Sequence, residues 1–302
     1  MSAPGLAAPA KSRLFAYGLM ILSVGLVGAS VPVSKMMLAV FPVFLFSAVR
    51  FAVAAVVSVP LAAREGPLWP RLDRRGWIFL MAQVVTGTLL FNVFLMYGLK
   101  LTDSVSAGII MATIPAAGMA GAILVLGEQP NRWQVTAIAL SVGGLLLVNI
   151  AAATGAGGTS LLGNALIIAA VITEAGFLLT SRALAGRMRG LQQTAFLNVA
   201  ALLMFLPFAI WQARDFDFGV PTAVDWLITA VHGLCVSLIA VLLWYRALRD
   251  LTANAAAPFF GVVPTTAAAV GILFLGEAMT PLKGVGMALT LAAIFIGSRG
   301  QR

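Results

Sequence analysis

The sequence predicts an all-α integral membrane protein with ten transmembrane helices, arranged as two inverted five-helix repeats. Three observations lead to this fold class. Of the 302 residues, 61% are hydrophobic and 10% are charged, whereas about a quarter of the residues of a soluble domain are charged. The apolar residues form blocks of about 20, the length at which a helix crosses the hydrocarbon layer of a bilayer. Similar stretches also recur at an almost constant offset along the chain.

Apolar runs between loop signals place the helices in order. The first run follows Lys11 and Arg13, as in a signal peptide, but it continues to about residue 37 and further spans follow. An uncleaved first helix is therefore expected. The ten expected spans are 14–37, 42–63, 77–98, 104–127, 132–150, 161–183, 192–212, 223–245, 253–275 and 281–298.

The small, flexible stretch "AAATGAGGTS" divides the chain in half. The expected organisation is a cytoplasmic N-terminus at 1–13, a first five-helix repeat at 14–150, a linker at 151–160, a second five-helix repeat at 161–298 and a cytoplasmic C-terminus at 299–302.

Basic residues indicate the orientation in the membrane. If the N-terminus is cytoplasmic, 14 of the 19 Lys and Arg residues lie on the cytoplasmic side, four lie outside, and Arg50 lies within the membrane. Cytoplasmic loops show this bias, which accounts for the net charge of +9 without a nucleic-acid partner. We therefore expect a multi-pass protein of the cell (inner) membrane with both termini in the cytoplasm.

The internal repeat is clearest in two stretches, "TIPAAGMAGAILVLGE" (113–128) and "VVPTTAAAVGILFLGE" (262–277), which match at an offset of 149. Each half carries five spans, an odd number, so the second half enters the membrane from the opposite side. Inverted repeats of this kind occur in secondary transporters, where the substrate site lies between the halves near the midplane.

These residues resemble the EamA-type exporters of the drug/metabolite transporter superfamily. The segment "FSAVRFAVAAVVSVP" (46–60) is similar to the second helix of that family, and the two "LGE" endings of the fourth and ninth spans are similar to its signature there. The resemblance covers nearly the whole chain and is strongest to the branch that exports aromatic and other amino acids. It implies a secondary transporter that exports amino acids, or related small metabolites, by alternating access around a central cavity. The first helix, "VGLVGASVPVSK", lacks the Trp and Asn often found there.

Glu174 is the first candidate for the transport pathway, because it lies about midway along the sixth span. A carboxylate there costs on the order of 3 kcal/mol. Phe177 and Ser181 share its helical face, and at an offset of 147 this face corresponds to that of Ser30 in the first helix. These faces are candidates to line the cavity. Glu174 can attract a substrate amino group or carry a proton there, or it can be a paired or protonated structural acid.

Four further residues are candidates for the pathway. Arg50 can hold a substrate carboxylate or tie helices together, and the family resemblance favours the structural role. Gln83 corresponds to His232 at an offset of 149, and His232 can titrate near neutrality or serve in hydrogen-bonded packing. Gln83 and Asn92 lie on opposite faces of the third helix, so at most one faces the cavity and the other bonds between helices. Phe91 is a candidate for stacking an apolar or aromatic substrate.

Prolines within the expected spans can act as hinges or gates, or can fix a permanent bend. The candidates for this role are Pro115, Pro258 and Pro264. Glu128 and Glu277, at helix ends, are expected to maintain the fold.

Other classes of protein fit the sequence less well. The chain has a single Cys, a single His and no P-loop, so no metal, cofactor or ATP-driven pumping is expected. A multidrug or other-metabolite exporter of the same fold is the main alternative. A membrane-embedded lipid-linked transferase or a channel is less favoured, and an enzyme is not expected. The expected partners are a small-molecule substrate and membrane lipid. A monomer suffices, because both halves of the symmetric unit lie on one chain.

Overall fold

The computed structural model describes residues 10–127, 129–154, 160–184, 186–247 and 257–299. Within these residues all regular structure is helical. Nine of the described helical stretches are long and apolar enough to cross a membrane, and Phe259–Leu275 forms a shorter apolar helix. The expected spans therefore all have a helical counterpart. The start of the ninth span lies outside the described residues. Both chain ends, most of the linker and Glu128 lie outside them as well.

The helices of the first repeat are α1 (Ala10–Leu38), α2 (Val43–Glu65), α3 (Arg74–Gln83), η1 (Val84–Leu90), α4 (Phe91–Leu101), α5 (Ser104–Met111), α6 (Ile114–Leu126) and α7 (Arg132–Ala153). Those of the second are α8 (Leu161–Leu184), α9 (Gly190–Ala213), α10 (Ala223–Leu234), η2 (Cys235–Ala240), α11 (Val241–Ala247), η3 (Ala257–Gly261), α13 (Val262–Leu275) and α14 (Pro281–Arg299).

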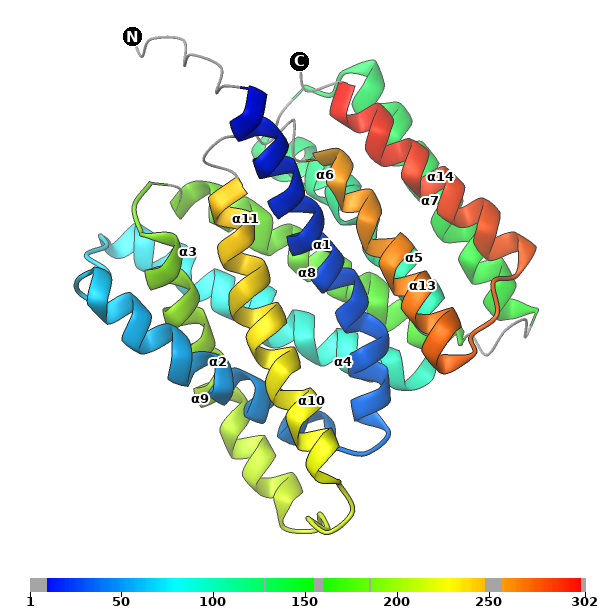
Figure 1. Cartoon of the computed structure of the whole chain (residues 1–302). Helices are drawn as coiled ribbons and strands as arrows, with labels where there is room; N and C mark the ends of the chain where they lie inside the picture. The colour runs from blue at the N-terminus through cyan, green and yellow to red at the C-terminus, as the bar shows by residue number, and fades with distance from the viewer. Residues whose placement is uncertain (1–9, 128, 155–159, 185, 248–256, 300–302) are drawn as a thin grey trace, which may run out of the picture.

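The helices pack across the two repeats (Figure 1). The last helices of the repeats, α7 and α14, lie together at one edge of the bundle, and the second helices, α2 and α9, pair towards the other. Between them α1 packs on α13 and α11, while α8 packs on α4, α3 and α6. The first and sixth spans, α1 and α8, thus make most of their contacts with other helices.

The second repeat runs in the opposite sense to the first. The N-terminal end of α1 and the C-terminal end of α14 lie at the same end of the bundle, which we call the terminal end (Figure 1). At the other end, Lys35 near the end of α1 contacts Glu277, which also binds the start of α5. Asn164, near the start of α8, bonds Thr102 just before α5. The repeats are therefore inverted.

Small residues bring the backbones of paired helices from the two repeats together. A Cβ built at Gly144 of α7 would lie 2.7 Å from the carbonyl oxygen of Gly286 in α14. Between α1 and α13, a Cβ at Gly28 would lie 2.5 Å from the carbonyl oxygen of Val263. Close packing of this kind holds membrane helices together, because lipid offers no hydrophobic driving force between them.

Two spans that the sequence predicts as continuous α-helices contain π segments. They are η1 (Val84–Leu90) in the third span and η2 (Cys235–Ala240) in the eighth, at equivalent positions of the two repeats. π segments are rare and frequently lie at functional sites.

The candidate hinge prolines lie near helix starts. Pro115 is in the first turn of α6, directly after the break that separates α5 from α6. Pro264 is in the first turn of α13, and Pro258 belongs to the 3₁₀ segment η3 before it. A proline in a first turn removes no intrahelical hydrogen bond, because the N–H groups there have no helical acceptor.

Candidate functional site

The first polar group in the bundle interior joins helices of both repeats. Its central contact is between Ser34 Oγ on α1 and His232 Nε2 on α10, at 3.0 Å. The Phe46 ring of α2 lies 5.4 Å from the imidazole, centroid to centroid. We call this group the His232 cluster; its members are Ser34, Phe46, Arg50, Asn92 and His232.

Arg50 is almost fully buried in the His232 cluster. Its Nη2 donates a hydrogen bond to Asn92 Oδ1, and its guanidinium lies 4.6 Å from the centre of the Phe51 ring. Asn92 therefore bonds between helices. Within the described part of the chain, Arg50 Nε and His232 Nδ1 are buried and have no hydrogen-bond partner. Buried polar atoms are normally paired, so these two atoms are exceptions in the described structure.

A second polar group, the Gln83 cluster, consists of Gln83, Ser181, Gln193 and Tyr245. Gln83 is fully buried at the end of α3 and donates to Ser181 Oγ on α8 at 2.5 Å. Its Oε1 accepts from Gln193 Nε2 at 2.8 Å, and the Tyr245 hydroxyl donates to Gln193 Oε1 at 3.3 Å. The amide of Gln83 is thus bonded on both sides, and the cluster ties α3 of the first repeat to three helices of the second.

The two clusters occupy equivalent positions. Ser34 and Ser181 correspond in the repeat, as do His232 and Gln83. In each case a serine on the first helix of one repeat bonds a polar side chain on the third helix of the other, just before a π segment.

Glu174 lies half-buried on the face of α8 that packs on the third span. A Cβ at Gly98 would lie 2.5 Å from Ile167, and one at Gly87 would lie 2.2 Å from Phe177. The antiparallel register between these contacts brings Glu174 level with Phe91, at the junction of η1 and α4. Among the described residues none donates a hydrogen bond to the Glu174 carboxylate. An unpaired acid within a span is costly and is by default a functional candidate.

The structure brings some of the candidate residues together and separates others. Phe177 packs directly on the η1 backbone at Gly87, and Phe91 is half-buried against the main core. The Ser30 hydroxyl donates to the Val27 carbonyl of its own helix at 2.6 Å. In the repeat Ser30 corresponds to Phe177, whereas the counterpart of Glu174 is Val27.

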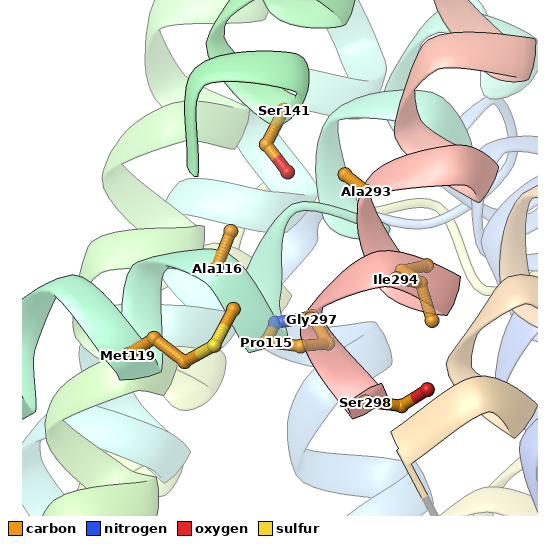
Figure 2. A pocket seen from close by; sticks show the side chains of 8 residues that line it. All are labelled: Pro115, Ala116, Met119, Ser141, Ala293, Ile294, Gly297 and Ser298. Carbon is orange, nitrogen blue, oxygen red and sulfur yellow. The ribbon is translucent and has the colours of Figure 1, made fainter. Parts of the chain in front are cut away.

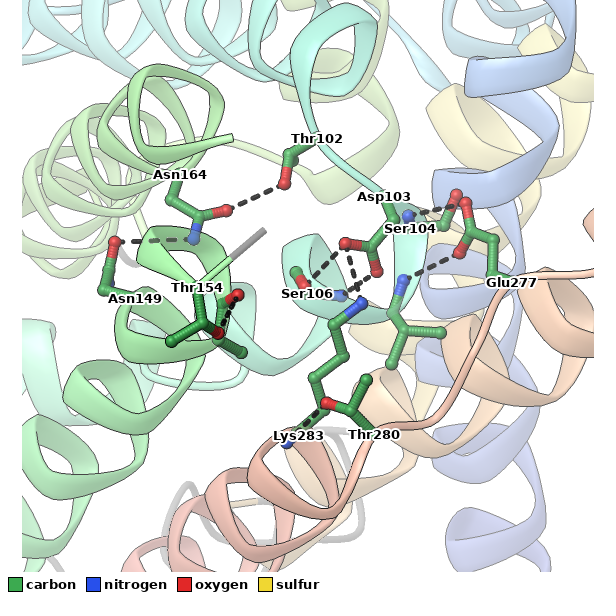
Figure 3. A network of polar contacts seen from close by, with 12 residues as sticks. Thr102, Asp103, Ser104, Ser106, Asn149, Thr154, Asn164, Glu277, Thr280 and Lys283 are labelled. Atoms are coloured by element: carbon green, nitrogen blue, oxygen red, sulfur yellow. Dashed lines mark hydrogen bonds and ion pairs between the residues drawn. The ribbon is translucent and has the colours of Figure 1, made fainter. Parts of the chain in front are cut away.

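A charged network at the end opposite the termini was not foreseen as a unit (Figure 3). Lys283 at the start of α14 forms an ion pair with Asp103 at 3.0 Å, and both side chains are buried. Glu277 accepts hydrogen bonds from the backbone N–H groups of Ser104 and Val105, at 2.9 and 3.0 Å, and pairs with Lys35. Each contact joins the two repeats.

The sequence carried part of the signal for this network. Asp103 stands before an apolar run, where an N-cap is expected, and it caps α5 by accepting from the Ser106 N–H at 2.8 Å. Lys283, by contrast, counts as an external loop residue in the charge pattern, since nothing near it in sequence indicates burial.

Two cavities lie away from these clusters. One of about 20 Å³ lies between α6, α7 and α14 beside Pro115 and Ser141 (Figure 2). This is room for about one water molecule, and the Ser141 hydroxyl is buried without a hydrogen-bond partner among the described residues. The other, of about 390 Å³, is an open groove beside Phe94 and Leu166. Neither is lined by Glu174 or His232.

Comparison with known proteins gives relatives along most of the chain. An uncharacterized transporter of Bacillus subtilis, YetK, is 33% identical over 288 residues, which cover 95% of this chain and 87% of that protein. A probable terminal-alkyne amino-acid exporter of Streptantibioticus cattleyicolor is 26% identical over 81% of each chain. A solved crystal structure superposes over 96% of both chains with a TM-score of 0.66 at 16% identity, which shows a shared fold.

The EamA-like transporter family matches twice, at residues 14–150 and 161–299. The two matches coincide with the two inverted sets of five spans, and each carries one member of the Gln83–His232 pair. Together they cover nearly all of the sequence, and the chain belongs to the EamA-like transporter family.

Proposed function

We propose that this transporter is an exporter of amino acids or related small metabolites, and that it works by alternating access between its repeats. The observation that carries the proposal is the half-buried Glu174 carboxylate of α8, which accepts no hydrogen bond from any described residue. A substrate ammonium group would supply the partner that Glu174 lacks. The name of the Streptantibioticus relative, an amino-acid exporter, supports the same substrate class.

The remaining candidate groups suit the other parts of such a substrate. Arg50 Nε and His232 Nδ1 are buried without a partner among the described residues, and both are suited to a substrate carboxylate, Arg50 through its fixed positive charge. Phe91 and Phe177 would form the apolar wall beside Glu174. Gln83 and Ser181 would close the pathway on one side of this site, and Ser34 and His232 on the other.

The direction and setting of transport are part of the proposal. The excess of basic residues in one set of loops supports cytoplasmic termini in the cell (inner) membrane. Pro115, Pro258 and Pro264 lie where helices start, and rigid movement of the following helices about these points would open one side at a time. A monomer provides both repeats and is the proposed working unit.

A second candidate is an exporter of apolar cations, including drugs. The residues beside Glu174 on its helical face are apolar, among them Val171 and Leu178. A cation without a carboxylate would use Glu174 and leave Arg50 and His232 unused.

The test is counterflow in liposomes that hold the purified protein, with labelled phenylalanine, threonine and methionine, with and without an imposed pH gradient. We expect saturable exchange that falls at least about tenfold in Glu174→Gln, because one charged contact of about 1.5–3 kcal/mol is lost. Glu65→Gln is the matched control, since Glu65 is an exposed carboxylate at the end of α2.

The outcomes separate the candidates. Exchange that survives Glu174→Gln would leave a carrier in which Glu174 is structural. Exchange of apolar cations alone, still sensitive to Glu174→Gln, would favour the second candidate. If no amino acid is exchanged, either with or without the pH gradient, the amino-acid assignment is refuted.

A further inference from the structure

The loop between α2 and α3, at the terminal end, combines exposed arginines with an exposed indole. Leu68 is 41% exposed and Trp69 is 69% exposed. Four arginines with exposed side chains surround these two apolar residues in the sequence. We call this segment the basic loop; its arginines are Arg64, Arg71, Arg74 and Arg75.

The second repeat holds the basic loop in place. Arg189 donates to the backbone carbonyls of Glu65 and Pro67, the latter at 3.0 Å. Gln192 Nε2 also donates to the Pro67 carbonyl, at 2.9 Å. These contacts fix the backbone on which the loop arginines stand.

The apolar part of the loop is also fixed. The Trp69 ring lies 5.3 Å from that of Trp77 and 6.2 Å from that of Phe196, centroid to centroid. The indole is thus held against two helices while more than half of its surface stays exposed.

No described acidic side chain pairs with the arginines of the basic loop. The nearby Asp73 carboxylate caps α3 and pairs with Arg187 at 2.9 Å. The four loop arginines form no ion pair or hydrogen bond with any described residue. They lie in or within a few residues of the adjoining ends of two candidate membrane spans, Val43–Glu65 and Arg74–Leu101.

We propose that the basic loop binds the headgroups of anionic phospholipids in the surrounding bilayer. Guanidinium groups match phosphate in geometry and charge, and basic clusters next to a span attract anionic lipid by about 1 kcal/mol per residue. Trp69 and Leu68 would enter the interfacial layer, where Trp is favoured. Because Arg189 and Gln192 hold the loop, bound lipid strengthens the contact between the repeats at this end.

Binding is tested on the full chain in detergent, from the rise in thermal unfolding midpoint as phosphatidylglycerol or phosphatidylcholine is added. We expect half-saturation at lower phosphatidylglycerol than phosphatidylcholine. The variant Arg71→Gln/Arg74→Gln/Arg75→Gln should need about tenfold or more phosphatidylglycerol, since three cations are lost. The control Lys100→Gln/Arg132→Gln/Arg299→Gln removes the same charge elsewhere and should change the value less than twofold.

A second measurement places the indole. Vesicles with brominated phosphatidylglycerol should quench protein fluorescence, and Trp69→Phe should lose part of that quenching. Equal response to both lipids, equal loss in the two triple variants, or full competition by soluble glycerol phosphate would overturn the lipid assignment. Quenching unchanged by Trp69→Phe would overturn the placement of the loop in the interface. None of these readouts depends on which substrate is transported.

Discussion

In the third helix of each repeat a polar side chain lies just before a π segment, and it is Gln83 in the first repeat and His232 in the second. Each bonds the equivalent serine on the first helix of the other repeat. The amide of Gln83 is bonded on both sides, whereas the second ring nitrogen of His232 has no partner in the described structure. The hydrogen bond between helices is therefore present in both repeats. The buried polar atom without a described partner is present only in the second repeat.

Other equivalent positions of the two repeats also share a structural role but differ in their polar contacts. Lys283 forms a buried ion pair with Asp103, while its counterpart Gln134 serves in the capping box that starts α7. Asp73 caps α3 and pairs with Arg187, while its counterpart Thr222 caps α10 without a basic partner among the described contacts. The repeats thus share the positions that stabilise helices and differ in the charges placed there.

The largest expected effect is at Lys283. Lys283→Ala leaves the Asp103 carboxylate buried without its cation, a change that costs about 3–5 kcal/mol. Gln134→Ala at the equivalent position removes half of a capping box and should cost about 1 kcal/mol or less. Thermal unfolding in detergent measures both. Similar losses in the two variants would mean that the ion pair stabilises the fold no more than the capping box does.

A smaller effect is expected at His232. His232→Gln makes the two clusters alike, and its amide can still bond Ser34, so the unfolding free energy should change by less than about 1 kcal/mol. His232→Leu leaves the Ser34 hydroxyl buried and unpaired and should cost about 1–3 kcal/mol. Chemical unfolding of the two variants side by side tests this, and the order Leu more stable than Gln would contradict it.

The smallest effect concerns Asp73 and pH. The Gly76 N–H bond and the nearby Arg187 hold the pKa of Asp73 below its ordinary value. A depressed folded-state pKa gives stability that is present above the unfolded pKa, near 4, and is lost as pH falls through the folded value. Asp73→Thr keeps an N-cap side chain, as Thr222 provides for α10. The thermal unfolding midpoint of this variant should depend less on pH below about pH 4. An unchanged acid slope would show that Asp73 does not contribute to it.

Hydropathy and the repeat offset predict the fold because both depend on spacing alone. The ten spans, their inversion and the correspondence of Gln83 with His232 all follow from periodicity. The offset cannot show which partner each side chain meets. Ser34 bonds His232 of the other repeat because α1 packs across the repeats, and that crossing is a property of the packed bundle.

Other features have no sequence signal of this kind. The π segments, VVTGTLL and CVSLIA, mix apolar residues with Thr, Gly and Ser as other parts of the spans do, so hydropathy does not distinguish them. Lys283 is read as a loop residue because lysine at a span end is usually exposed, and only the fold brings Asp103 over it. The offset makes the helix faces of Ser30 and Glu174 equivalent, but it does not show that the Ser30 hydroxyl bonds a carbonyl of its own helix.

The contact of α7 with α14 has a consequence for biosynthesis. The glycine face of α7, with Gly144 at its centre, fits against Gly286 of the last helix. A ribosome that adds about 5–20 residues per second delivers α14 on the order of ten seconds after α7. Until then α7 is inserted in the membrane without its partner, so the first repeat cannot complete its packing until the C-terminal helix has been synthesised.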